Sequence, residues 1–229
     1  MNVDNTTPHK SASYDQDVRQ TIPFYETVHL ETVDLVRRAM PGVRRWLDTG
    51  GGTGYLIELA LPHFPSTQFI LADPSEAMLG QAARRLANVP GHRLKILPPL
   101  GSEGMLSWDG PPPQVITALM CHHYLQAPAR REALRACYQV LDDGGLFITF
   151  ENIAPSTDRG LQIGLERWKH FQLEQGRALP TVEAHLKRFG VNYFPLTVAE
   201  HLELLHVVGF QRVETLWLSY MQAGFYAIK

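Results

Sequence analysis

An acidic residue and a cluster of glycines occur together in the stretch WLDTGGGTGYL, residues 46–56. The spacing D-x-G-x-G-x-G is formed by Asp48, Gly50, Gly52 and Gly54. Glycines at this density remove side chains, so a ligand can lie against bare backbone. The dinucleotide fingerprint G-x-G-x-x-G fails because Tyr55 stands at its third glycine, and no Gly-Lys-Ser/Thr of a phosphate-binding loop follows. The motif therefore predicts a loop for another kind of nucleoside ligand.

A second acid, Asp73, ends the next apolar run, QFILAD. An acid at the tip of the second strand of a nucleotide-binding sheet can accept hydrogen bonds from both ribose hydroxyls. The simpler alternative is an ordinary tight turn followed by a helix that Asp73 caps. Because the loop, its spacing and the acid agree, we predict that the loop passes beneath a ribose and an amino-acid tail, and that Asp73 holds the sugar.

Two adjacent histidines, His122 and His123, follow a later apolar run in the stretch QVITALMCHHYL. Imidazole titrates near neutral pH, so either histidine is a candidate general base. The alternative is that one histidine forms a hydrogen bond with the backbone and the other packs under a helical cap. Glu151 ends the following strand-like run and is a third candidate catalytic group, although it could instead cap the next helical segment.

Strand-like and helix-like patterns alternate between residues 44 and 150. The expected strands are 44–50, 68–73, 93–97, 114–120 and 146–150, and the expected helices are 55–61, 74–89 and 128–141. This alternation predicts a parallel sheet covered on both faces. Residues 152–195 carry two helical patterns without a strand. A helix with a Thr197–Glu200 capping box and two strands, joined tightly at residues 221–223, complete the chain.

These patterns predict an α/β fold of one domain, a doubly wound Rossmann-like sheet of seven strands. The sheet is mainly parallel, its last strand is antiparallel, and a helical cap is inserted. The expected parts are a flexible N-terminal tail (1–13) and a domain (14–229) made of lid helices (14–45), a cofactor-binding core (46–151), the cap (152–195) and a terminal helix and strand pair (196–229).

Composition limits the possible functions. The 229 residues are 45% hydrophobic and carry a net charge of −2, which suits a globular protein and gives no basic footprint for nucleic acid. No apolar run is long enough to span a membrane, and the N-terminus lacks the apolar core of a signal peptide, so we expect a cytoplasmic protein. The sequence leaves open whether the protein forms a homodimer. A metal site built from Cys121, His122, His123 and the distant His185 has no support from spacing, and we predict no metal.

Together, the segments LDTGGGTG, ILADPSEAML, QVITALMCHHYL and LDDGGLFITFEN resemble the class I S-adenosylmethionine-dependent methyltransferases. The resemblance implies S-adenosylmethionine as cofactor. It implies that Asp48, Gly50, Gly52 and Gly54 line the methionine and ribose moieties, that Asp73 holds the ribose hydroxyls, and that Pro74 or Met78 flanks the adenine. The family often has an acid after the third strand, where this chain offers Gly101 and Ser102.

The resemblance also assigns roles around the reacting centre. Met120 at the end of the fourth strand would contact the cofactor, and Tyr124 the substrate. The segment SYDQDVRQTIPFYE would form a flap, in which Tyr14 and Arg19 meet the cofactor and Tyr25 the substrate. Arg19 would pair with the methionine carboxylate, or else form a surface ion pair with Asp15 or Asp17.

The cap sequence, from ERWKHF to HVVGF, resembles the corresponding region of carboxy-S-adenosylmethionine synthases, which act in tRNA wobble-uridine modification. In that comparison Arg188 stands where those enzymes hold the extra carboxylate of their product, although Lys187–Arg188 could simply be a solvated basic pair. Our leading prediction is methyl transfer to a small and possibly acidic molecule. The alternatives are a carboxy-S-adenosylmethionine synthase-like or tRNA-pathway enzyme, and a non-catalytic protein that binds S-adenosylmethionine.

Overall fold

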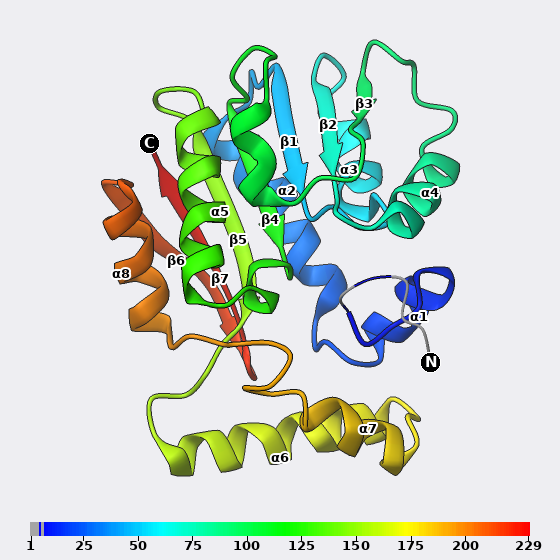
Figure 1. The fold of residues 1–229 in the computed structure, drawn as a ribbon. Helices are drawn as coiled ribbons and strands as arrows, with labels where there is room; N and C mark the ends of the chain where they lie inside the picture. Colours follow the sequence, from blue (N-terminus) through cyan, green and yellow to red (C-terminus); the bar gives the residue numbers. More distant parts are fainter. Residues whose placement is uncertain (1–4, 6) are drawn as a thin grey trace.

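The computed structural model describes residues 5 and 7–229 (Figure 1), so residues 1–4 and 6 of the predicted tail lie outside the described part. A seven-stranded sheet forms the centre. Its strands are β1 (Arg45–Thr49), β2 (Gln68–Ala72), β3 (Leu94–Ile96), β4 (Val115–Leu119), β5 (Leu146–Asn152), β6 (Arg212–Ser219) and β7 (Gln222–Ile228). Their order is β3-β2-β1-β4-β5-β7-β6; the first five are parallel, and β7 is antiparallel to both its neighbours. This confirms the predicted fold class.

Helices cover both faces of the sheet and its lower end in Figure 1. They are α1 (Tyr14–Arg19), α2 (Tyr25–Ala39), α3 (Tyr55–Ala60), α4 (Glu76–Arg85), α5 (Ala127–Val140), α6 (Asp158–Glu174), α7 (Leu179–Leu186) and α8 (Val198–Val208), with short 3-10 turns η1 (Ser11–Ser13), η2 (Leu61–His63), η3 (Ser102–Ser107) and η4 (His122–Tyr124). Within the described residues, no helix has the length and apolar character needed to cross a membrane.

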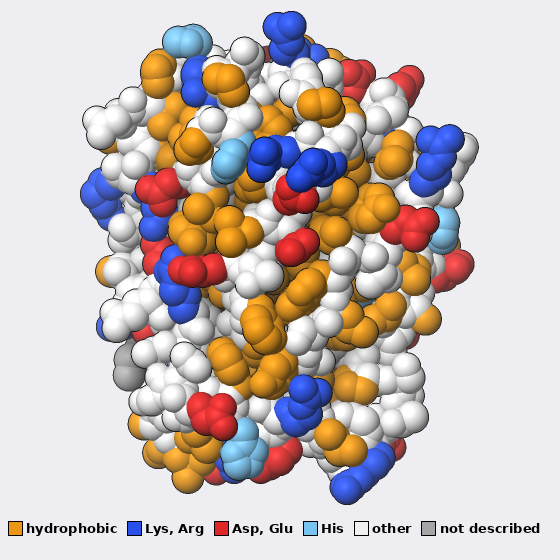
Figure 2. Space-filling view, turned by 180° about the vertical axis from the view of Figure 1, so that it is seen from behind, with side chains coloured by type: hydrophobic (Ala, Val, Ile, Leu, Met, Phe, Trp, Pro, Cys, Tyr) orange, Lys and Arg blue, Asp and Glu red, His pale blue; other side chains and the backbone are white. Residues whose placement is uncertain are grey.

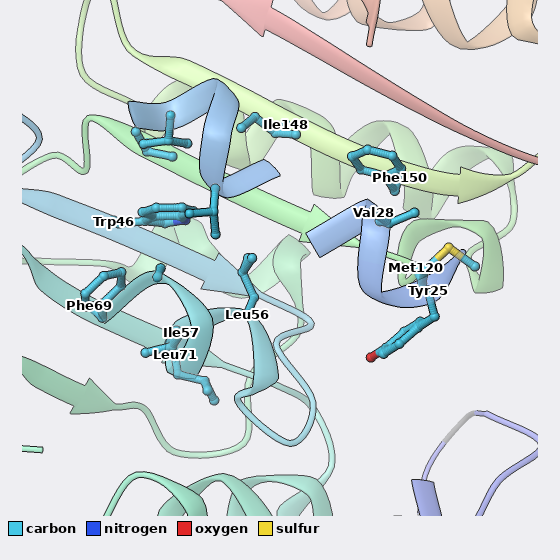
Figure 3. Packing of buried hydrophobic residues seen from close by; sticks show 14 of the residues in the cluster. Tyr25, Val28, Trp46, Leu56, Ile57, Phe69, Leu71, Met120, Ile148 and Phe150 are labelled. Atoms are coloured by element: carbon cyan, nitrogen blue, oxygen red, sulfur yellow. The ribbon is translucent and has the colours of Figure 1, made fainter. Parts of the chain in front are cut away.

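The strands are apolar on both faces because each face has its own core. Trp46 of β1 packs with α2 and α3, while the next residue, Leu47, packs on the opposite side with α5 and α8. Figure 3 shows the first core, in which Phe69, Ile148 and Phe150 point toward these helices. Side chains of successive strand residues point to opposite faces, so a sheet buried on both sides needs continuous apolar runs.

Local capping fixes where two helices begin. The side chain of Ser75 accepts a hydrogen bond from Met78 N and caps α4, which leaves Asp73 free for another role. Thr197 and Glu200 form the predicted capping box at α8. The final hairpin turns at Tyr220 and Met221, because Gln222 already pairs with Ser219 and Asn152, so the predicted join at 221–223 was slightly misplaced.

The cap helices α6 and α7 lie beyond the ends of the strands (Figure 1), on the side toward which the parallel strands run. The start of this segment is attached to the turn between β6 and β7, where Ile153 N donates to Met221 O, and its two ends are joined by a bond from Ala154 N to Leu196 O. The buried Trp168 of α6 donates from Nε1 to Thr21 O at 2.7 Å. The cap is thereby joined to the N-terminal helices as well as to the sheet.

Candidate active site

The glycine loop joins β1 to α3 at the carboxyl end of the sheet. Gly50, Gly52 and Gly54 have φ angles of 65°, 55° and 76°, in the left-handed region that favours glycine. A Cβ on Gly50 would lie 2.5 Å from Cys121 Cβ, whereas a Cβ on Gly52 would meet nothing within 4 Å. Gly50 therefore allows close packing against the end of β4, and Gly52 presents open backbone to the neighbouring cavity.

Asp73 connects the loop to the end of β2. Its Oδ2 accepts a hydrogen bond from Gly52 N at 2.9 Å, and its Oδ1 accepts one from Ser75 N at 2.8 Å. The side chain is 7% exposed, and burial raises its pKa. Each carboxylate oxygen can accept a further hydrogen bond, so Asp73 can still receive two hydroxyl groups from a ligand in the cavity.

Asp48 is a buried carboxylate with few hydrogen bonds. Its Oδ1 accepts from Thr117 Oγ1 at 2.7 Å, and Trp46 Nε1 donates to the same hydroxyl. Burial raises the pKa of Asp48 to about 7, with a smaller contribution from the charge of Asp73. A cationic ligand group beside this carboxylate would offset its desolvation. Asp48 borders a small pocket whose other side chains include Tyr14, Tyr25, His29 and Tyr55.

A cavity of about 300 Å³ opens beside the loop and collects most of the residues singled out in the sequence. Its lining includes Tyr14, Gly50, Gly52, Asp73, Pro74, Met78, Gly101, Ser102, Met120, His122 and Tyr124. Gly54 lies apart, where a Cβ would lie 2.9 Å from Leu86, so it serves the packing of α3. The lining also contains Asn5, Thr7 and Glu103, which the sequence analysis missed because their types and spacing form no motif.

The two histidines have different surroundings. His122 lines the cavity, its Nε2 lies 2.8 Å from Ser102 Oγ, and its buried Nδ1 has no hydrogen-bond partner among the described residues. Burial lowers the pKa of His122, so the ring is neutral at pH 7. His123 is 1% exposed, and both of its ring nitrogens are engaged, Nδ1 by Glu151 at 2.6 Å and Nε2 by Asn152 at 3.1 Å. Of these two histidines, only His122 has a ring nitrogen without a hydrogen-bond partner among the described residues.

Glu151 lies behind the cavity wall. Its two oxygens accept hydrogen bonds from His122 N, His123 N, His123 Nδ1 and Thr149 Oγ1 at 2.6–3.2 Å. Burial by itself would raise the pKa of Glu151, but the hydrogen bond and charge of His123 lower it to about 2. The carboxylate can form a three-member cluster of metal-ligand type with Cys121 and His122, although its oxygens are already occupied by these donors.

The N-terminal helices are fastened to the glycine loop. Asp15 accepts a hydrogen bond from Thr53 Oγ1 at 2.8 Å and forms an ion pair with Arg85. Arg19 does not line the cavity: its Nε bonds to Glu26 Oε1 at 2.9 Å, and its guanidinium lies 4.8 Å from the centre of the Tyr55 ring. Its ion pair is thus with Glu26 and not with Asp15 or Asp17, the partners considered from the sequence.

Basic residues gather where the cap meets the N-terminal residues. The positive charge of Arg188 acts on Tyr124, a residue of the cavity wall, and on Tyr193. Burial, followed by the charges of Arg177 and Arg188, lowers the pKa of His9 to about 4. The buried His185 experiences the same effects. His9, in the predicted tail, is itself only 5% exposed.

Residues 47–147 match a protein-family model described as a methyltransferase domain. The match begins in β1 and ends in β5, and includes the glycine loop, Asp73 and the His122–Tyr124 turn. The matched part of the chain is a methyltransferase domain of the class I S-adenosylmethionine-dependent type. Its cofactor is accordingly S-adenosylmethionine.

Two relatives illustrate what this methyltransferase is similar to. The carboxy-S-adenosyl-L-methionine synthase of Trichodesmium erythraeum (strain IMS101) is 27% identical over 219 residues, which cover 94% of this chain and 85% of the relative. The trans-aconitate 2-methyltransferase of Acidovorax sp. (strain JS42) is 45% identical over only 56 residues, 24% of this chain and 22% of the relative.

A solved structure shares the whole fold of the methyltransferase. The plantazolicin methyltransferase BamL, in complex with a triazolic desmethylPZN analog and S-adenosylhomocysteine, aligns with a TM-score of 0.72 at 15% identity. The alignment covers 98% of this chain and 92% of BamL, so the cap and the N-terminal helices are part of the likeness.

The residues of the site fit the cofactor. Gly52 offers bare backbone to the cavity, Asp73 has hydrogen-bond acceptors to spare for hydroxyl groups, and the buried Asp48 suits a cationic group. Met120 lines the cavity with a strained φ of 56° and is held by its N–H bond to Phe150 O. When bound, the cofactor supplies a methyl group that its sulfonium has already activated.

Proposed function

We propose that this methyltransferase acts on a small molecule that carries an anionic group, enclosed between the cavity wall, the N-terminal residues and the cap. The observation that supports this proposal is the positive charge of Arg188, which acts on Tyr124 of the cavity wall. Arg177 adds a second positive charge nearby. A carboxylate or similar anion would be stabilised there by charge-assisted hydrogen bonds.

The way in which the cavity is enclosed supports a compact molecule as the methyl acceptor. The described residues of the N-terminal segment contribute Asn5, Thr7 and Tyr14 to the cavity lining, and Trp168 joins this segment's helices to the cap. The face seen in Figure 2 has no basic footprint for a nucleic-acid acceptor, because acidic and basic side chains are interspersed over it. A small ligand can be surrounded in this cavity, and water can be excluded from it.

We further propose His122 as the general base when the acceptor must lose a proton. Its ring lines the cavity, is neutral and keeps Nδ1 unpartnered among the described residues. His123, with both nitrogens bonded, and Glu151, with both oxygens bonded, would orient the wall without touching the acceptor. Tyr25 borders the pocket of Asp48, so we propose a contact with the cofactor or with an acceptor close to it.

The experiment is a screen of small carboxylates and other anions with S-adenosylmethionine, read by the release of S-adenosylhomocysteine. With the best acceptor, Arg188→Met should raise KM about 10- to 100-fold, because a hydrogen bond to a charged group contributes about 1.5–3 kcal/mol. Lys187→Met is the matched control, because Lys187 is the exposed neighbour of Arg188, and it should leave KM unchanged. Equal KM values in wild type and Arg188→Met would contradict the anionic acceptor.

A second candidate is formation of carboxy-S-adenosylmethionine. Relatives of that name cover most of this chain and most of their own length, including the cap with Arg188. Native mass spectrometry of the purified protein separates the two candidates. A retained mass equal to S-adenosylhomocysteine or S-adenosylmethionine supports ordinary methyl transfer, whereas a mass larger than S-adenosylmethionine by a carboxyl group supports the second candidate.

A further inference from the structure

The cavity wall at η4 lies between two buried groups of opposite charge. On one side, the carboxylate of Glu151 accepts hydrogen bonds from the backbone N–H groups of His122 (3.2 Å) and His123 (2.9 Å). On the other, the guanidinium of Arg130 donates from Nε to His122 O at 3.0 Å and from Nη2 to His123 O at 3.3 Å. The anion therefore holds the N–H groups of this turn, and the cation holds its carbonyl groups.

The same guanidinium also reaches the cap. Arg130 Nη2 donates to Leu125 O at 3.0 Å and to the carbonyl of Phe194, near the end of the cap segment. Phe194 N in turn donates to His123 O at 2.7 Å. One side chain of α5 thus joins the turn that carries His122 and Tyr124 to the segment through which the cap returns to the sheet.

Burying a charged side chain costs free energy, and the packing of α5 alone does not require it. Arg130 is 2% exposed, and burial lowers the pKa of its guanidinium, an effect that the charges of Glu151 and Glu200 partly offset. Replacing buried charged groups by apolar residues of similar size is often neutral or stabilising, so stability alone does not account for them. What the two charges provide is a fixed orientation of the peptide groups between them.

We propose that Arg130 is a positioning residue of the methyltransferase. Together with Glu151 it sets the geometry of the His122–Tyr124 turn and couples this geometry to the cap at Phe194. The inference deepens the proposed function, because His122 and Tyr124 are the groups that it positions. Without the guanidinium, four carbonyls lose a donor, the turn relaxes, and the wall formed by Met120–Leu125 no longer fits the cofactor.

The test compares wild type, Arg130→Met and Arg130→Lys, with Arg131→Met as the matched control, since Arg131 is the exposed next residue of the same helix. Two readouts are used, and neither needs an acceptor, so the result is independent of the proposed function. Calorimetry measures the affinity for S-adenosylhomocysteine. Side-chain nitrogen NMR reports the His123 Nδ1 proton, which the short contact with Glu151 should keep in slow exchange.

We expect Arg130→Met to bind S-adenosylhomocysteine about tenfold more weakly, equivalent to one or two lost wall contacts, and to lose the slowly exchanging His123 signal. Arg130→Lys keeps the charge but not the planar fork, so it should fold and show the same defects to a smaller degree. Arg131→Met should match wild type in both readouts. The proposal is overturned if Arg130→Lys, and Arg130→Met where it folds, keep wild-type affinity and the His123 signal and change only the melting temperature.

Discussion

The two sides of the cavity are constructed differently. The donor side, which we define as the glycine loop with Asp48 and Asp73, comes from a single stretch of chain, and Asp73 is bonded directly to the loop at Gly52. The acceptor side, which we define as the His122–Leu125 turn, the N-terminal residues and the cap, is assembled from segments as distant as Asn5 and Phe194. Methyltransferases that share a cofactor need the same donor side, whereas the acceptor side can differ from one acceptor to another.

The largest expected effect is on the acceptor side. His122→Ala should lower kcat about 100-fold with an acceptor that must be deprotonated, because it removes the cavity-wall imidazole whose Nδ1 has no partner among the described residues. Affinity for S-adenosylhomocysteine should change much less, which would separate the two sides of the cavity. His170→Ala, at an exposed position of α6, is the control. A kcat that stays at the wild-type value would exclude His122 as the base.

An effect of similar size is expected on the donor side. Gly50→Ala should weaken binding of S-adenosylhomocysteine about 100-fold, because it combines the cost of a left-handed residue with a collision with Cys121. Gly42→Ala is the matched control, because a Cβ at Gly42 would meet nothing within 4 Å. Calorimetry on both variants measures the difference. If the two bind equally well, the loop does not need bare backbone at Gly50.

A pH dependence would show whether Asp48 carries charge when the cofactor binds. In the free protein its pKa is raised to about 7, so the carboxylate is mostly protonated at pH 6 and mostly ionised at pH 8. Since a cationic group prefers the ionised form, affinity for S-adenosylhomocysteine should rise about tenfold from pH 6 to pH 8. Asp48→Asn should remove this rise; a rise that persists in the variant must come from another group.

The smallest expected effect concerns the fastening of the N-terminal helices. Asp15→Asn removes the ion pair with Arg85 and weakens the bond from Thr53, a partly exposed contact worth about 0.5–1 kcal/mol. Dissociation of S-adenosylhomocysteine should become about three- to fivefold faster in stopped-flow measurements. Asp34→Asn, which breaks an exposed pair with Arg38 on α2, should leave the rate unchanged. Equal rates in both variants would mean that the lid is not fastened by Asp15.

The difference between the two sides also explains what the sequence could predict. The sheet, its antiparallel end and the Thr197 capping box follow from local periodicity and were predicted correctly. Of the donor-side groups that we proposed as ligands, Gly50, Gly52 and Asp73 line one cavity, and Asp48 borders the small pocket beside the same loop. Gly54, from the same motif, instead serves the packing of α3. Ser75 caps α4, so Asp73 does not have the capping role that the sequence left open for it.

The acceptor side lacked such a local signal. In an amphipathic helix, Arg130 and Arg131 look alike, and only the fold decides which one is buried. His9 lies in a polar stretch without periodicity, yet it is buried against the cap through contacts distant in the chain. The different roles of His122 and His123 depend on Ser102 and Asn152, each about 20 to 30 residues away.

The most direct test of this division is calorimetry of S-adenosylhomocysteine binding to Asp73→Asn and Arg188→Met. Asp73→Asn should weaken binding about 100-fold, because hydrogen bonds from hydroxyls to a charged acceptor are lost, whereas Arg188→Met should bind like wild type. Glu76→Gln, an exposed change one turn away from Asp73, controls for altered charge near the site. Equal losses in both variants, or a loss confined to Arg188→Met, would contradict the assignment of donor and acceptor sides.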